Sequence, residues 1–275
     1  MNIGPLLFST GVLTLLFAVV AGMGTNAFLK HRGRADAGNA LLLALACGLL
    51  TARVAFVAHW WPQYAQQPLS ILNVRDGGFD AVFGVLALAL ASALIAWRRA
   101  ALRQSLTAAV VVGTLAWGMA VLAVNALRAS ARQPLPALVL RDVHGQQRTL
   151  QSLRGQPTVI NLWATWCPPC RREMPVLAAA QKSMPGIRFV FADQGESSAA
   201  VQRYLRQEQL ELDHVLIDPN LDLSKWYGAR GYPTTLFIGA DGLLRDIQIG
   251  ELSRGTLAAH LARIAAPANR PRQLP

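Results

Sequence analysis

The feature that most limits what this chain can fold into is a set of four long apolar segments in its first half. Each has about 19 residues or more, enough for a helix to cross roughly 30 Å of hydrocarbon. We therefore expect an α-helical transmembrane bundle within residues 1–132, with spans at about 5–29, 38–61, 79–97 and 105–127. The first segment has no basic residue before it and three similar segments follow, so we interpret it as a span and not as a cleaved signal peptide.

Basic residues between the segments predict their orientation. They gather in two connections, Lys30, Arg32 and Arg34 in the first and Arg98, Arg99 and Arg103 in the last. The loop over residues 62–78 has only Arg75, beside Asp76. The positive-inside rule places both clusters in the cytoplasm. We therefore expect a multi-pass protein of a bacterial inner membrane, with both chain ends outside and the downstream domain in the periplasm.

The formal net charge of +11 raises the question of nucleic-acid binding. Residues 1–140 carry ten Lys and Arg against three Asp, and most of these basic residues lie in the short connections. Residues 141–275 carry sixteen Lys and Arg against twelve Asp and Glu, interspersed as on a solvated surface. A continuous basic patch is the usual footprint of nucleic-acid binding, so we expect the lipid bilayer, and no nucleic acid, as a partner.

After the polar connection at residues 128–136, strand-like and helix-like runs alternate, which predicts an α/β domain over residues 133–266. The Pro- and Arg-rich residues 267–275 predict a disordered tail. The expected strands are 137–141, 147–150, 158–162, 187–193, 214–217, 234–238 and 243–249, and the expected helices are 169–181, 197–209 and 253–264.

Two of the three cysteines, Cys167 and Cys170, lie where a strand-like run leads into a helix-compatible run. At this spacing they can close a small disulfide ring and open it again, and the helix N-terminus can hold the first sulfur as a thiolate. The alternative is half of a zinc site. Zinc needs about four ligands, and the chain has neither a second Cys-x-x-Cys nor a His-x-x-x-His pair. We therefore interpret the pair as redox-active, with no metal and no cofactor.

Five motifs follow one another between residues 135 and 264. They are Val143 to Gln146 with Leu150 to Pro157, Asn161 to Cys170, Arg171 to Pro175, Gly231 to Thr235, and Asp241-Gly242. In this order they resemble the TlpA-like (ResA/DsbE-type) branch of the thioredoxin superfamily. The resemblance implies a thioredoxin-like domain with the activity of a thiol:disulfide oxidoreductase.

The two cysteines and the prolines between them have separate expected roles. Cys167 comes first, at the helix start, and is expected to be the exposed, attacking thiolate. Cys170 lies one turn further and resolves the mixed disulfide, which leaves a redox-active Cys167–Cys170 disulfide. Pro168 and Pro169 remove two backbone donors that could stabilise the thiolate. They are also suited to helix initiation alone.

The other expected site residues rest on the resemblance. Pro233 is implied to be a cis-proline that brings the backbone of Tyr232 beside the first cysteine, where it pairs with a client. Of the two tryptophans that flank the motif, Trp163 and Trp166, we expect one in the core and one on the client-binding surface, and we assign Trp166, with the two prolines and Tyr232, to that surface.

An acidic residue near the motif is the expected proton carrier. The thioredoxin position for a buried aspartate holds Asn161 here. Glu173, three residues past Cys170, matches the acid of ResA-like relatives, so we expect it to tune the thiols and handle protons. The alternative is a first-turn glutamate that favours the helix dipole.

The first half resembles, over short motifs, part of prolipoprotein diacylglyceryl transferase: Ala52 to Val57, then Arg75 to Phe79. Val82 stands where that enzyme's histidine falls, so we expect a degenerate scaffold without the transferase activity. Arg53, inside a predicted span, indicates a function, an ion pair with Asp76 or Asp80, or a side chain that snorkels toward a lipid headgroup.

Cys47 is a single thiol that cannot cycle without a partner, so we interpret it as a packing residue. The chain would then receive its electrons from a separate carrier, such as a DsbD-type protein. We expect the chain to reduce disulfides in client proteins with cysteine pairs; the family's clients include apocytochrome c, in cytochrome c biogenesis, and copper-site proteins. Three alternatives stay open: an oxidase or isomerase that uses the same cysteines, a lipid-modifying transferase with an accessory thioredoxin domain, and a metallochaperone that holds a soft metal.

Overall fold

The computed structural model describes residues 10–130 and 133–265 of the chain, which divide into two compact units. The N-terminal unit ends with residue 130 of the described chain, and the C-terminal unit begins at residue 133. The disordered tail predicted for residues 267–275 and the start of the first predicted span lie outside the described residues.

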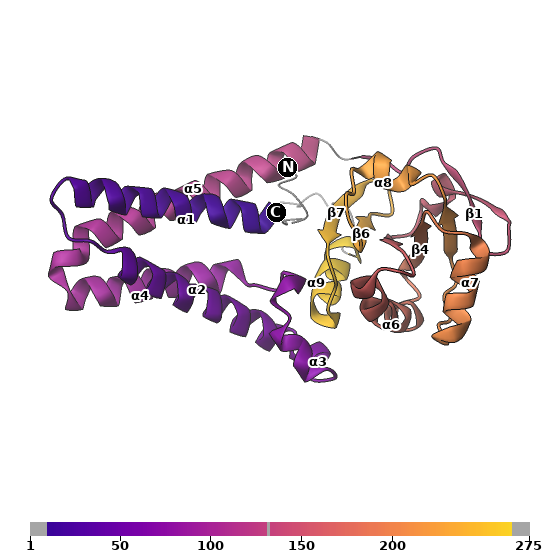
Figure 1. The fold of residues 1–275 in the computed structure, drawn as a ribbon, viewed down its shortest axis with the longest axis horizontal. Coiled ribbons are helices and arrows are strands. Elements are labelled where there is room, and N and C mark those ends of the chain that lie inside the picture. The colour runs from indigo at the N-terminus through magenta and orange to yellow at the C-terminus, as the bar shows by residue number, and fades with distance from the viewer. Residues whose placement is uncertain (1–9, 131–132, 266–275) are drawn as a thin grey trace, which may run out of the picture. The chain divides into compact units, whose positions relative to one another are not determined.

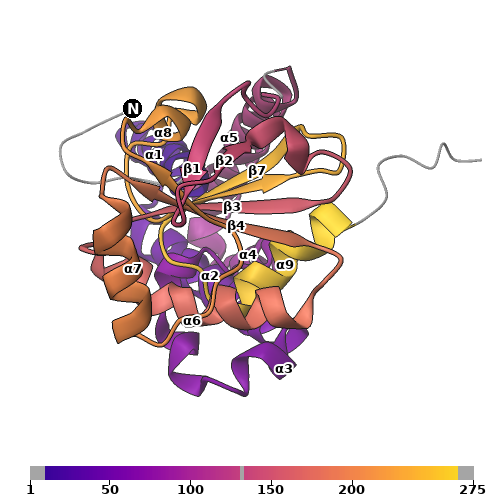
Figure 2. The same ribbon diagram turned by 90° about the vertical axis from the view of Figure 1, so that its right-hand side faces the viewer.

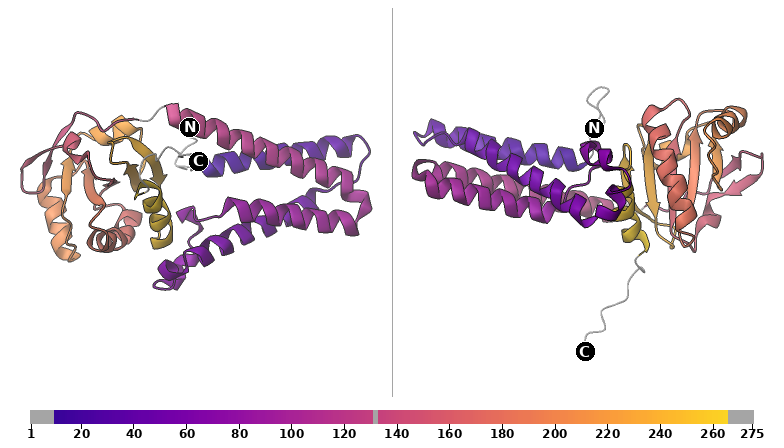
Figure 3. Two further views of the ribbon diagram at one scale, coloured as in Figure 1. Left: turned by 180° about the vertical axis from the view of Figure 1, so that it is seen from behind. Right: turned by 90° about the horizontal axis from the view of Figure 1, so that it is seen from below.

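The N-terminal unit contains the four predicted apolar helices, and all four are long and apolar enough to cross a membrane. Helix α1 lies beside α5, and α2 lies beside α4 (Figures 1 and 3). Short helical turns connect α2 to α4 and α4 to α5. The elements are α1 Thr10–His31, α2 Gly38–His59, α3 Trp61–Tyr64, η1 Pro68–Leu72, η2 Val74–Asp76, α4 Ala81–Arg98, η3 Ala100–Leu102 and α5 Arg103–Ser130.

Glycines allow the paired helices to approach closely. A Cβ atom at Gly48 of α2 would lie 3.0 Å from the carbonyl oxygen of Gly84 in α4. A Cβ atom at Gly22 of α1 would lie 3.1 Å from the carbonyl oxygen of Ala109 in α5. Small residues at such crossings are how apolar helices gain packing contacts when both sides of the interface are equally apolar.

Arg53 is the buried centre of the connection between α2 and α4. Its Nη1 lies 2.9 Å from Asp76 Oδ1 and donates to the carbonyl oxygen of Gly78 at 2.8 Å. Its Nη2 donates to the carbonyl oxygen of Ile71 at 2.9 Å, and Tyr64 donates its hydroxyl to Asp76 Oδ2 at 2.8 Å. A buried charge is stable only when it is paired and hydrogen-bonded. Of the sequence-based alternatives for Arg53, the ion pair with Asp76 is therefore confirmed.

Asp80, the other expected partner of Arg53, instead caps α4. Its Oδ1 accepts from the backbone N–H groups of Val82 and Phe83. Its own backbone N–H donates to the carbonyl oxygen of Ala52 at 2.9 Å. Helix α4 therefore begins level with Ala52, seven residues before α2 ends at His59, which corresponds to about 10 Å along a helix.

The C-terminal unit is built on one seven-stranded sheet with the strand order β2-β1-β5-β4-β3-β6-β7. Figure 2 shows this sheet with α6, α7 and α9 beside it. The central strands β3, β4 and β5 run parallel, and antiparallel strands flank them on both sides. The elements are β1 Val139–Asp142, β2 Gln147–Thr149, η4 Leu150–Leu153, β3 Thr158–Trp163, α6 Pro168–Ser183, β4 Arg188–Gln194, α7 Ser198–Gln207, β5 Val215–Asp218, α8 Asp222–Tyr227, β6 Thr234–Ile238, β7 Leu244–Ile249 and α9 Arg254–Ala265.

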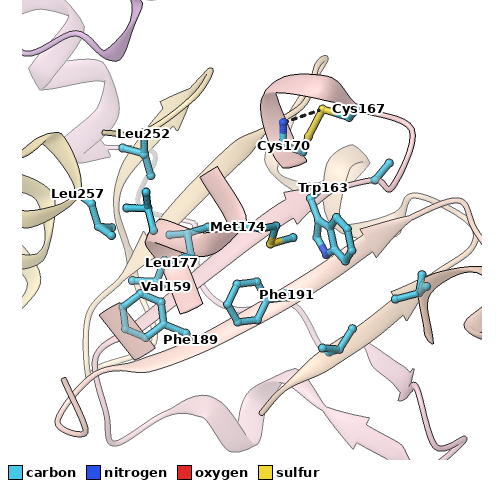
Figure 4. Close-up of a cluster of buried hydrophobic side chains, with 14 of the residues drawn as sticks. Val159, Trp163, Cys167, Cys170, Met174, Leu177, Phe189, Phe191, Leu252 and Leu257 are labelled. Atoms are coloured by element: carbon cyan, nitrogen blue, oxygen red, sulfur yellow. Dashed lines mark hydrogen bonds between the residues drawn. A yellow bond between two sulfur atoms is a disulfide. The ribbon is translucent and has the colours of Figure 1, made fainter. Parts of the chain in front are cut away.

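Alternate residues of the central strands face two separate apolar cores. In β3, Val159 and Trp163 belong to the core that α6, α7 and α9 cover, whereas Ile160 and Leu162 belong to the core on the α8 side. Figure 4 shows Met174 and Leu177 of α6 against the first of these cores. All six residues of β3 are buried, as expected for a strand covered on both faces.

Two short elements differ from the prediction. Leu150, expected to end a strand, begins the 3-10 helix η4. Helix α8, which the sequence does not predict, has only six residues. It forms because the Asp218 carboxylate at the end of β5 accepts from the N–H groups of Asp222 and Leu223, at 2.9 Å each. A helix this short has no apolar periodicity by which it could be recognised in the sequence, and it depends on a cap from the preceding strand.

Candidate active site

The two cysteines lie at the turn from β3 into α6. Trp163 ends β3, and Cys167 is the N-cap residue of α6, with the extended backbone that a cap requires. Cys167 and Cys170 form a disulfide (Figure 4). The Sγ of Cys167 also accepts from the backbone N–H of Cys170 at 3.3 Å. The two sulfurs therefore lie within the first turn of α6.

The prediction that the Cys167 sulfur is exposed is wrong for this disulfide-bonded state. Only 3% of Cys167 is exposed, and Cys170 is fully buried. The reason is that the Sγ of Cys167 is bonded to a buried sulfur and both residues belong to the core under α6. Apolar surroundings of this kind disfavour a thiolate.

The prolines occupy the first two helical positions of α6. An N-cap side chain accepts from the N–H groups of the second or third helical residue. Pro169 is the second helical residue and has no N–H. Cys170, the third helical residue, therefore supplies the hydrogen bond to Cys167. The helix start therefore stabilises a Cys167 thiolate less than an ordinary helix start would.

Glu173, in the same helix as the two cysteines, is fully buried. It follows Cys170 by three residues, a spacing at which side chains are neighbours on one face of a helix. Asn161 Nδ2 donates to its Oε1 at 2.7 Å, and the backbone N–H of Leu252 donates to its Oε2 at 2.9 Å. Burial raises the pKa of Glu173 to about 8, against the lowering effect of these two donors. The carboxyl group can therefore gain and lose a proton near neutral pH.

Asn161 holds this carboxyl group in place. Its Nδ2 also donates to the Thr235 hydroxyl at 3.0 Å, so one amide joins α6 to β6 across β3. From its place in the sequence, Asn161 is identified only as a substitute for an aspartate. Its positioning role could not be read from the residue type, because it depends on the antiparallel pairing of Asn161 with Thr235.

The expected client-binding residues come together in part. The Tyr232–Pro233 peptide bond is cis. Trp166 is 65% exposed, and its ring centroid lies 6.2 Å from that of Tyr232 in an edge-on contact. Trp163, by contrast, is fully buried, which confirms that one tryptophan is core and the other surface. The Tyr232 hydroxyl lies 3.2 Å from Ser224 Oγ, so a hydrogen bond to α8 holds the tyrosine side chain.

A second carboxylate, which the sequence did not single out, reaches the same turn. Glu196 accepts two hydrogen bonds from Thr165, two residues before Cys167. Glu196 follows β4, the parallel neighbour of β3. The carboxyl ends of parallel strands lie at the same edge of a sheet, so the position of Glu196 after a strand was the available signal. Among the described residues, no group of three or more His, Cys, Asp or Glu side chains is placed to hold a metal ion.

A disulfide at the first turn of the helix that follows the central strand of a thioredoxin-like sheet defines a protein of dithiol–disulfide exchange. Residues 131–247 match the AhpC/TSA family. The thiol-disulfide oxidoreductase ResA of Bacillus thuringiensis (strain Al Hakam) is 30% identical over 131 residues, which are 47% of this chain and 75% of ResA. The thiol:disulfide interchange protein DsbE of Pseudomonas fluorescens biotype C is 37% identical over 121 residues, 43% of this chain and 66% of DsbE.

Among solved structures, a thioredoxin-family thiol:disulfide interchange protein from Chlorobium tepidum TLS is 26% identical, with a TM-score of 0.44, and the match covers 48% of this chain and 96% of that one. Over its C-terminal half, the chain belongs to the ResA/DsbE-like thiol-disulfide oxidoreductases. It is a thiol:disulfide oxidoreductase.

Proposed function

We propose that the chain is a membrane-anchored protein-disulfide reductase that acts in the periplasm through Cys167 and Cys170. The observation that carries the direction is the start of α6, where a backbone donor is missing at Pro169 and the sulfurs are buried. Both features disfavour the thiolate. A dithiol whose thiolate is poorly stabilised gives up its electrons more readily, in contrast to strong oxidants, whose reduced form is stabilised.

The proposed exchange has two steps. The Cys167 thiolate attacks one sulfur of the client disulfide, so that a mixed disulfide forms and the other client sulfur leaves as a thiolate. Cys170 then loses its proton, for which Glu173 is the proposed acceptor, and attacks the Cys167 sulfur. This second attack releases the remaining client thiolate and leaves the Cys167–Cys170 disulfide. The client gains two electrons and, once its thiolates are protonated, two protons.

The surface beside the disulfide is proposed to receive the client. Trp166 is exposed in front of Tyr232, and Pro168 is exposed at the helix start. Together with Pro169 and the backbone beside Pro233, these residues form the proposed client contact. Clients with cysteine pairs, such as apocytochrome c or copper-site proteins, and a DsbD-type electron donor are the partners that the family resemblance implies.

The reduction potential tests the direction. The full chain in detergent is equilibrated in dithiothreitol and glutathione buffers, and its free thiols are trapped with a maleimide. Mass spectrometry of the peptides that carry Cys167 and Cys170 keeps Cys47 out of the measurement. A potential at or below roughly −220 mV supports the reductase. A potential of about −120 mV is typical of strong oxidants and would support the oxidase alternative instead.

The N-terminal unit is proposed to be the membrane anchor. Its four long helices carry exposed apolar side chains, among them Val20, Leu50, Leu90 and Leu122, that suit a lipid environment. The basic residues of the first and last connections favour a cytoplasmic position for both. Single cysteines placed in these connections should react with a membrane-impermeant maleimide only after lysis. Labelling of intact spheroplasts would contradict the proposed orientation.

The transferase resemblance of this unit is proposed to reflect scaffold and not activity. The guanidinium of Arg53 is directed at the chain's own groups, the carboxylate of Asp76 and the carbonyl oxygens of Ile71 and Gly78. An arginine so engaged has no donor directed outward for a lipid phosphate. Val82, in place of the histidine, is exposed at the start of α4.

A further inference from the structure

The turn that carries Cys167 is hydrogen-bonded, through Thr165, to the loop that follows β4. The backbone N–H of Thr165 donates to Glu196 Oε2, and the Thr165 hydroxyl donates to Glu196 Oε1, both at 2.6 Å. One carboxylate therefore accepts two hydrogen bonds from one residue. Hydrogen bonds to a charged acceptor are shorter and stronger than neutral ones, and the paired geometry fixes both the position and the rotation of Thr165.

The backbone of Glu196 is itself hydrogen-bonded to a buried acid, Asp193. Asp193, at the end of β4, is fully buried, and its Oδ1 accepts the backbone N–H of Glu196 at 3.0 Å. Burial, together with the Glu196 carboxylate beside it, raises the pKa of Asp193 well above its usual range.

The segment that Thr165 holds is the one that meets a client. Its two ends are already fixed, because Trp163 lies in the core and Cys167 caps α6. Between them, Trp166 projects outward and contacts Tyr232. A shift of Thr165 would move both the Trp166 ring and the sulfur that a client approaches.

We propose that Glu196 is a positioning residue for thiol–disulfide exchange, which holds Trp166 and Cys167 in the reactive orientation through its two hydrogen bonds to Thr165, with Asp193 as its buried support. The inference rests on Cys167 and Cys170 being the reacting pair of the proposed function, but it does not depend on the direction of exchange. It assigns a role in the reaction to three residues that do not touch the sulfurs.

The test is a matched pair of substitutions that leave the charge of the site unchanged. Thr165→Val has nearly the same shape as threonine but lacks the hydroxyl, whereas Thr165→Ser keeps it, and both keep the backbone N–H. The full chain in detergent is oxidised and then reduced with excess dithiothreitol, and the second-order rate constant for loss of the Cys167–Cys170 disulfide is measured. The thermal midpoint of each variant is measured beside it.

The expected result is a rate at least about tenfold lower for Thr165→Val, because small misplacements of reacting groups cost factors of this order or more. Thr165→Ser should stay within about twofold of the original rate, which a general loss of packing would not predict. Glu196→Gln, which places an N–H donor opposite the Thr165 donors, should slow reduction as Thr165→Val does. Glu211→Gln, which removes an exposed ion pair with Lys182, is the control and should leave the rate of reduction unchanged.

A Thr165→Val protein that is folded and reduced at the original rate would overturn the proposal. A lower thermal midpoint with an unchanged rate would do the same, because it would assign Thr165 a purely structural role. If the disulfide of the unsubstituted chain is not reduced at all, the proposed function fails and this inference fails with it, whereas an unchanged rate in Thr165→Val overturns this inference alone. The two failures are therefore separable in one experiment.

Discussion

Glu173→Gln should change how the stability of the thioredoxin-like unit depends on pH. Burial raises the pKa of Glu173 to about 8 from a reference value of 4.5. Between these two pH values the unfolded chain has lost the proton that the folded chain still holds. The unfolded state then binds fewer protons, so the free energy of unfolding falls as pH rises through this window. Glutamine does not titrate, so the substitution removes this loss.

The expected magnitude follows from the size of the shift. Each pKa unit corresponds to about 1.4 kcal/mol. Between pH 5 and pH 8.5, the wild-type chain should therefore lose about 4 kcal/mol more stability than the Glu173→Gln chain. Glutamine keeps one acceptor oxygen, for either the Asn161 amide or the Leu252 N–H, and its own NH2 group then faces the other donor. This clash lowers stability equally at both pH values.

Urea unfolding of the oxidised full chain in detergent, followed by pulse proteolysis, gives the free energy at each pH. The quantity compared is the difference between variant and wild type, which cancels other titrating groups such as Asp193. Glu211→Gln, an exposed carboxylate whose pKa Lys182 lowers, is the control, and it should show no change of this sign. Parallel stability curves for wild type and Glu173→Gln would refute a raised pKa at Glu173.

Three further predictions follow. Pro169→Ala supplies an N–H for the Cys167 thiolate and should raise the reduction potential by about 30 mV or more, whereas an unchanged potential would contradict the role given to Pro169. Arg53→Met leaves the buried Asp76 carboxylate without its ion-pair partner and should lower the free energy of unfolding by about 3–5 kcal/mol. The loss should be seen as rapid proteolysis between residues 64 and 80, and the added Asp76→Leu should restore resistance to the protease. Gly48→Ala, whose Cβ would lie 3.0 Å from a carbonyl oxygen, should lower the thermal midpoint, but Gly24→Ala, with open space there, should not.

The elements with a strong pattern were predictable from the sequence. The four apolar helices follow from length and composition alone, and β3 follows from an apolar run bounded by turn residues. The disulfide turn follows from the cysteine spacing at the end of that run. In each case the signal lies within one contiguous stretch of chain.

The parts that were missed depend on contacts between distant residues. Helix α8 needs the Asp218 carboxylate as a cap, and the contact of Asn161 with Glu173 and Thr235 needs the pairing of β3 with β6. The near-complete burial of Cys167 is also a property of the assembled core and not of the motif. A residue type and its spacing specify neither the burial of a side chain nor its partners across a sheet.

The offset between α2 and α4 bears on which lipid the protein fits. In the proposed membrane orientation, the cluster around Arg53 and Asp80 marks the outer boundary of the hydrocarbon, because α4 begins there. The 18 residues of α4 then span about 27 Å, slightly less than an average bilayer core of about 30 Å. Helix α4, the shortest of the four long helices, thus sets the hydrophobic thickness, and the longer α5 must tilt to match it. Hydrophobic mismatch should therefore be least in bilayers with short acyl chains.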